Sequence, residues 1–163
     1  MSRTHILAID PGQKPGVAQF EIETDIGGGP DVVRLVRVSH KIEPWCYAAP
    51  KWDVLAVELQ WHHAGGKASV QSLLSLAFRA GFTLGNIPAA RRLALPPRIW
   101  RGEGNNASKE QVQKRIARDL TAAERQLFSD IPKARHGDVL DAIGIGRAAL
   151  ALAPNTTQYD WSI

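Results

Sequence analysis

The sequence is poor in the features that mark several common classes of protein. Its single cysteine, Cys46, excludes an internal disulfide and a zinc site built on paired cysteines, and thiol chemistry is not expected. No apolar run reaches the roughly 18 residues that cross a bilayer, and the residues Met1–Ile6 lack the apolar region of a secretory signal. We therefore expect a cytoplasmic protein that does not bind membranes.

Phosphate-binding loops of the P-loop type are also missing. The run Gly27–Gly29 is not followed by Lys and Ser or Thr, and it lies in a predicted hairpin turn. An actin-like or sugar-kinase ATPase would need two domains and about twice this length. The 163 residues show no repeats, low-complexity tract or linker, so we expect one domain over residues 1–163.

Positive charge is present but unevenly distributed. The net charge is +4, and residues 91–135 hold eleven Lys and Arg against five Asp and Glu. A basic surface of this kind attracts nucleic acid. Carboxylates on the same surface would repel phosphate unless divalent cations lay between them. The positions of the acidic residues therefore indicate whether this surface binds nucleic acid with the help of metal ions.

Hydrophobic patterns predict an α/β protein. Five apolar runs indicate strands, the first three forming an antiparallel meander, at residues 4–10, 16–23, 32–40, 54–57 and 93–95. The segment between the third and fourth strands is expected to be a loop. Apolar spacing and capping residues predict helices at residues 69–85, 108–120, 121–124 and 137–152.

Four acidic residues stand at informative places in this pattern. Asp10 and Glu58 end apolar strands, where a buried carboxylate costs stability unless it has a partner. Asp138 and Asp141 share one face of the last helix, although acidic residues in a first helical turn also favour the helix dipole by themselves. If all four meet, hard divalent cations relieve their repulsion, and a pair about 4 Å apart can hold a phosphate and activate water.

The motifs that carry these residues resemble the RuvC family of Holliday-junction resolvases, within the RNase H-like nucleases. The resemblance rests on Ile6–Gly12, Ala56–Glu58 and Asp138–Ile143, in that order. It implies a mixed five-stranded sheet flanked by helices, a homodimer, and nicking of branched DNA with Mg²⁺ or Mn²⁺, two ions per active site. It also implies that Asp10, Glu58, Asp138 and Asp141 bind the metal and act in catalysis.

The resemblance extends to DNA-binding residues. Ser108–Gln113 is similar to the start of a family helix whose lysine lies beside the active site and contacts phosphate, which makes Lys109 a candidate; the alternative is an exposed lysine without a role. Further candidates for phosphate contact are Arg98, Arg101, Lys114, Arg115 and Arg118.

Trp61 follows Glu58 by three residues, where the family pattern has an aromatic that stacks on a base; it could equally fold onto the core. We expect His136 to be exposed in a first helical turn rather than to bind metal or assist water activation. Gly144 and Gly146 interrupt the last helix, and we interpret them as sites of close packing.

Three functions remain open from the sequence. A structure-selective endonuclease that nicks four-way junctions symmetrically, leaving 5′-phosphate and 3′-hydroxyl ends, agrees best with the four carboxylates. An RNase H-like nuclease acting on RNA or an RNA–DNA hybrid would share the fold. A non-catalytic DNA-structure-binding protein is the third. A symmetric junction calls for two active sites related by a two-fold axis, and we expect a homodimer formed through the apolar face of residues 69–82.

Overall fold

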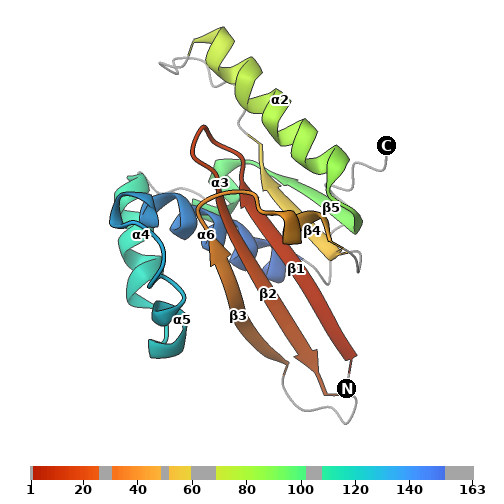
Figure 1. Ribbon diagram of the computed structural model, residues 1–163, viewed down its shortest axis with the longest axis vertical. Helices are drawn as coiled ribbons and strands as arrows, with labels where there is room; N and C mark the ends of the chain where they lie inside the picture. The colour runs from red at the N-terminus through yellow and green to blue at the C-terminus, as the bar shows by residue number, and fades with distance from the viewer. Residues whose placement is uncertain (1, 26–30, 49–51, 60–68, 102–107, 153–163) are drawn as a thin grey trace.

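The centre of the molecule is a mixed five-stranded sheet. The structure, a computed structural model, describes residues 2–25, 31–48, 52–59, 69–101 and 108–152. The strands are β1 (Ser2–Asp10), β2 (Gly16–Thr24), β3 (Val32–Ser39), β4 (Trp52–Glu58) and β5 (Ala89–Leu95). They follow the order β3-β2-β1-β4-β5 across the sheet (Figure 1). The first three strands pair antiparallel and β4 lies parallel to both β1 and β5, which confirms the predicted fold class.

Helices cover both faces of this sheet. They are α1 (Pro44–Tyr47), α2 (Val70–Asn86), α3 (Pro97–Arg101), α4 (Lys109–Arg118), α5 (Ala122–Gln126) and α6 (His136–Leu152), which a 3-10 turn over Lys133–Arg135 precedes. Helix α6 packs on β1 and β2, with α3 and α4 against it. Helix α2 packs on β4 from the other side (Figure 1). No helix in the described ranges is long and apolar enough to cross a membrane.

The core has two layers because side chains alternate along each strand. On β1, Ile6 and Ala8 belong to the cluster beneath α6, whereas Leu7 and Ile9 belong to the cluster beneath α1 and α2. Strands buried on both faces appear as continuous apolar runs, which is why the sequence identified β1 and β4 so readily.

Two glycines allow α6 to lie close to its neighbours. A Cβ atom at Gly144 would come within 2.7 Å of the Trp100 ring, and one at Gly146 would overlap the Phe20 ring. This confirms their interpretation as sites of close packing. Glycine lowers helix propensity at both positions, but it allows α6 to contact α3 and the sheet closely.

Three local predictions are corrected by the structure. Residues 44–47, expected in a loop, and residues 97–101, for which no helix was expected, form the short helices α1 and α3. Both begin at a proline, whose fixed φ suits a first helical position. Strand β5 begins at Ala89 rather than at residue 93, because Arg91 and Arg92 interrupt the apolar run used to find strands.

Candidate active site

Two of the predicted carboxylates leave neighbouring strands on the same face of the sheet. On β1, Ile6 and Ala8 point into the core beneath α6, so Asp10 points the same way. Strand β4 runs parallel to β1, with Ala8 beside Ala56. When this register is extended by two residues, Asp10 lies beside Glu58. Both side chains are buried, with 8% of Asp10 and 4% of Glu58 exposed.

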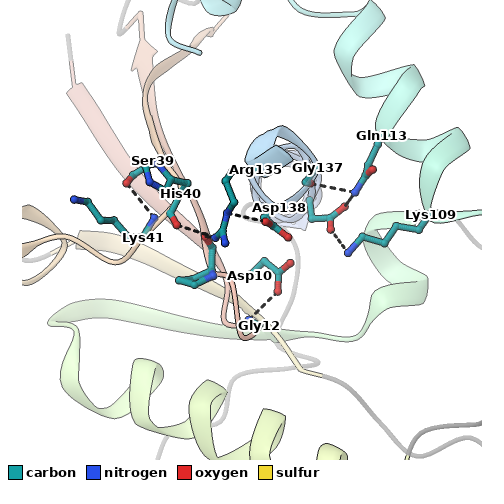
Figure 2. A network of polar contacts seen from close by, with 12 residues as sticks. Asp10, Gly12, Ser39, His40, Lys41, Lys109, Gln113, Arg135, Gly137 and Asp138 are labelled. Carbon is teal, nitrogen blue, oxygen red and sulfur yellow. Dashed lines mark hydrogen bonds and ion pairs between the residues drawn. The ribbon is translucent and has the colours of Figure 1, made fainter. Parts of the chain in front are cut away.

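Asp141 reaches this face of the sheet from α6 and is fully buried. Two residues of α4 hold its two carboxylate oxygens. Lys109 Nζ lies 2.5 Å from Asp141 Oδ2, and Gln113 Nε2 donates a hydrogen bond of 2.8 Å to Asp141 Oδ1. Figure 2 shows Lys109 and Gln113 extending from α4 toward the start of α6.

The three buried carboxylates act on one another electrostatically. Burial raises the pKa of Asp10 to about 6, and the charge of Asp141 adds to this rise. Burial raises the pKa of Glu58 to about 7, with the charge of Asp10 as the next cause. Burial also raises the pKa of Asp141, against hydrogen bonds from Lys109 and Gln113 that lower it. Burial is thus the main cause of all three raised pKa values, and the charge of a neighbouring carboxylate adds to it for Asp10 and Glu58.

Asp138 lies at the margin of this group, with 24% of its side chain exposed. Its Oδ2 atom is 3.2 Å from Nε of Arg135, and the same guanidinium donates to the carbonyl oxygens of His40, at 3.0 Å, and Pro15, at 3.4 Å (Figure 2). The charge of Asp138 also contributes to the raised pKa of Asp10. Arg135 thus ties the start of α6 to the ends of the neighbouring strands.

The turn after β1 is built around glycine. The Gly12 N–H donates to Asp10 Oδ1 at 3.1 Å, and a Cβ atom at Gly12 would crowd this oxygen at 3.3 Å. A Cβ atom at Gly16 would overlap the backbone carbonyl of Asp138, so only glycine lets β2 begin this close to α6. From the other side of the sheet, Arg79 of α2 donates to the Gly12 carbonyl at 3.2 Å.

Two predicted DNA-binding residues lie directly against the carboxylates. Lys109 pairs with Asp141. Burial lowers the pKa of the Lys109 ammonium group, but the hydrogen bond and the charge of Asp141 raise it by more, so the pKa is raised overall. Arg101 Nη2 lies 3.7 Å from Glu58 Oε1, and its guanidinium stacks 4.8 Å from the centre of the Trp100 ring. The site therefore has two positively charged side chains at its edge, Lys109 and Arg101.

The remaining predicted DNA-binding residues are not brought to the carboxylates. Arg98, Lys114, Arg115 and Arg118 are exposed. At about 100° per residue, the last three lie on the side of α4 away from Lys109. Arg118 pairs with Asp119 at 3.2 Å. Trp61 lies outside the described residues.

Sequence reasoning missed Gln113 and Arg135, and it was wrong about His136. The spacing of Gln113, one helical turn after Lys109, could have revealed that both residues face the same partner. Arg135 lies three residues before Asp138, with which it pairs, but its other partners, the carbonyl oxygens of Pro15 and His40, lie far away in the sequence. His136 is half-buried rather than exposed, because its Nε2 lies 2.9 Å from the Ile131 carbonyl oxygen and its ring packs edge-on against Phe128.

The donor chemistry of the site fits a hard divalent cation. Its donors are carboxylate oxygens, and within the described part of the chain Glu58 Oε1 is buried without a hydrogen-bond partner. No group of three His, Cys, Asp or Glu side chains in those same ranges is already arranged as a metal site. Instead, Lys109 and Arg101 face two of the carboxylates.

No protein-family model matches the chain, and no curated protein matches it by sequence. Solved structures do match it. RuvC from Thermus thermophilus aligns with a TM-score of 0.50 at 19% identity, over 92% of this chain and 95% of that one. The Fowlpox virus resolvase, solved with its substrate Holliday junction DNA, aligns with a TM-score of 0.53 at 14% identity, over 93% and 99%. The chain therefore has a RuvC-like resolvase fold.

Proposed function

We propose that this protein is a metal-dependent, structure-selective endonuclease that nicks Holliday junctions or other branched DNA symmetrically, leaving 5′-phosphate and 3′-hydroxyl ends. The observation that carries the proposal is the convergence of Asp10, Glu58 and Asp141, all buried, from two parallel strands and a helix. Burying three carboxylates together is costly, and a stability role does not account for it. The resolvase-like fold around them supports phosphodiester hydrolysis.

Four carboxylates would hold the cations, Mg²⁺ or Mn²⁺ and two per site: Asp10, Glu58, Asp138 and Asp141. When bound, such ions neutralise a scissile phosphate and supply a nucleophile from water at neutral pH. The contribution of the chain is a set of oxygen donors, three of which are held by neighbouring residues. Asp10 is held by Gly12, Asp141 by α4 and Asp138 by Arg135.

Basic residues would hold the DNA beside these carboxylates. Lys109 is 48% exposed at its side chain and opens α4, where helix N–H groups also favour a phosphate. We assign Lys109 to contact the phosphate near the cut. Arg101 borders the same site, and Arg98, Lys114, Arg115 and Arg118 would contact phosphates further along the DNA. Trp61 would stack on an unpaired base.

A second copy of the chain would complete a symmetric enzyme. Helix α2 exposes an apolar stripe at four-residue spacing, with Val70, Leu74, Phe78 and Phe82 between 55% and 73% exposed. Ala77, Gly81 and Gly85 lie beside this stripe and would allow two helices to approach closely. We assign this face to a homodimer, because two sites related by a two-fold axis match the symmetry of a four-way junction.

A cleavage assay tests the proposal. Matched four-way junction, linear duplex and RNA–DNA hybrid are incubated with the protein, with and without Mg²⁺. We expect cutting of the junction alone, at symmetric positions and only with the cation. Preferred cutting of the hybrid would show an RNase H-type substrate instead.

The Glu58→Gln and Asp138→Asn variants serve as controls for the site. Both should stop nicking while junction binding persists, because they remove charge and leave shape unchanged. Binding without cleavage by the unaltered protein, at any concentration of Mg²⁺ or Mn²⁺, would identify a non-catalytic junction-binding protein. A flat response of binding to rising salt would contradict the phosphate contacts.

A further inference from the structure

Gln113 is the one neutral side chain that connects α4 to the candidate cation ligands in the described structure. It lies four residues after Lys109, so both side chains leave the same face of α4. Its Nε2 atom donates to Asp141 Oδ1 at 2.8 Å and to the Gly137 carbonyl oxygen at 3.1 Å. Figure 2 shows this amide between α4 and the first turn of α6.

The chemistry of these two contacts determines which end of the amide faces α6. A carboxylate and a carbonyl are both acceptors, so the NH₂ group must point toward them, and its two hydrogens supply one bond each. Gln113 is neutral, so it orients Asp141 without cancelling its charge. Lys109, on the other oxygen, does add a positive charge. The two residues of α4 therefore have different effects on the same carboxylate.

Gly137 makes room for this amide. A Cβ atom at Gly137 would stand 3.2 Å from Gln113 Nε2 and 3.3 Å from Gln113 Oε1, closer than side chains usually pack. The residue lies in the first turn of α6, in a backbone conformation that any residue adopts. Glycine is suited to this position because it leaves space beside Gln113, and not because of its backbone angles.

We propose that Gln113 is a positioning residue that holds the Asp141 carboxylate in the orientation required to bind the catalytic divalent cation, and that Gly137 leaves the space for it. The inference rests on the proposed function, since it assumes that Asp141 is a cation ligand. Residues that orient the ligands of a metal commonly change its affinity by about 10- to 100-fold when they are replaced.

The principal test replaces Gln113 by methionine, which keeps the length of the side chain and removes both hydrogen bonds. Binding of Mn²⁺ to the full chain is measured by electron paramagnetic resonance, at a temperature where thermal unfolding shows the variant to be folded. We expect binding at least about 10-fold weaker than in the unaltered protein. Raised Mn²⁺ should restore most of the nicking rate, which a general structural defect would not allow. The control is Gln126→Met, at an exposed glutamine of α5, and should bind Mn²⁺ normally.

Gly137→Ala provides a second, independent test that does not threaten folding, since alanine favours a helix. The variant should remain folded while weakening Mn²⁺ binding, because its Cβ atom would stand 3.2 Å from Gln113 Nε2. If Gln113→Met or Gly137→Ala is folded and binds Mn²⁺ normally, while Asp141→Asn and Glu58→Gln lose binding, the inference about Gln113 is overturned and the proposed function stands. If Asp141→Asn and Glu58→Gln also bind normally, the cation site of the proposed function is itself wrong.

Discussion

Helices α2 and α6 have the same length, 17 residues, but opposite relations to the sheet between them. Helix α6 buries nine of its residues, including Asp141, whereas α2 buries only Ala80 and Thr83. The exposed side of α2 carries an apolar stripe, and α2 contains no acidic residue. Helix α6 buries a carboxylate in the core, and helix α2 exposes large apolar side chains to solvent.

Each arrangement is unfavourable for an isolated chain, and each indicates a ligand or partner. A carboxylate inside an apolar helix costs stability, and it is tolerated where a cation uses it. A stripe of large apolar side chains on a surface helix is typical of a protein interface. Under the proposed function, the α6 face would carry the chemistry and the α2 face would form the dimer.

The largest expected effect is at the buried charge of α6. Asp141→Asn keeps the size of the side chain and removes its charge. We expect nicking to fall by at least about 10²- to 10³-fold, comparable with losing a main electrostatic group of an active site. Urea unfolding should show equal or higher stability, because the cost of a buried carboxylate is gone. A variant that cuts junctions at the normal rate would remove Asp141 from the site.

The next effect is a pH dependence confined to the α6 face. Without divalent cations, folding raises the pKa of Asp10 from 3.8 to about 6 and of Glu58 from 4.5 to about 7. Between about pH 4 and pH 7 the folded state thus binds more protons than the unfolded state. Stability should fall as pH rises through this window, by up to about 1.4 kcal/mol per pH unit for each group.

Urea unfolding in EDTA at a series of pH values measures this dependence. Glu58→Gln should remove its upper part, and added Mg²⁺ should reduce the fall because the cation binds the ionised carboxylates. Replacing Arg79, the only charged residue of α2, should leave the upper part in place. Stability that rises steadily from pH 4 to pH 7 would contradict the shared burial of Asp10 and Glu58.

A matched pair of glycines compares how tightly the two helices are packed. Gly146→Ala places a methyl group against the Phe20 ring and should destabilise the fold by about 1–3 kcal/mol. Gly81→Ala meets no atom within 4 Å and should stabilise α2 by about 0.5–1 kcal/mol. Thermal unfolding of both variants, at a protein concentration where only monomer is present, distinguishes them. Equal changes in stability at the two positions would contradict the difference in packing between α6 and α2.

The last expected effect acts on association and not on folding, and it concerns the apolar stripe. Phe78, 73% exposed, is the most exposed aromatic of α2. Phe78→Asp places a charge in the proposed interface and should weaken dimerisation by about 2 kcal/mol, roughly 30-fold. Analytical ultracentrifugation measures the association, with Phe78→Leu as a control that keeps apolar character. A protein that is monomeric at every concentration would exclude this dimer.

The strands and longer helices were predictable because their signals are local. Asp10 and Glu58 each follow an apolar run, and Ser108 and Thr121 each begin a capping box that the structure contains. The short helices α1 and α3 were missed because a single turn of helix has no periodicity to detect. His136 was misjudged because its partner, the Ile131 carbonyl, becomes available only through the 3-10 turn before α6.

The order of elements, the placement of acidic residues at strand ends and the mixed α/β fold follow from the chain alone, since alternation and helical spacing act over a few residues. Contacts between distant residues do not. Gln113 and Asp141 are 28 residues apart, and Arg135 and Pro15 are 120 apart. Which oxygen each donor reaches depends on how α4 and α6 pack on the sheet, and this packing is fixed by the side chains of several elements at once.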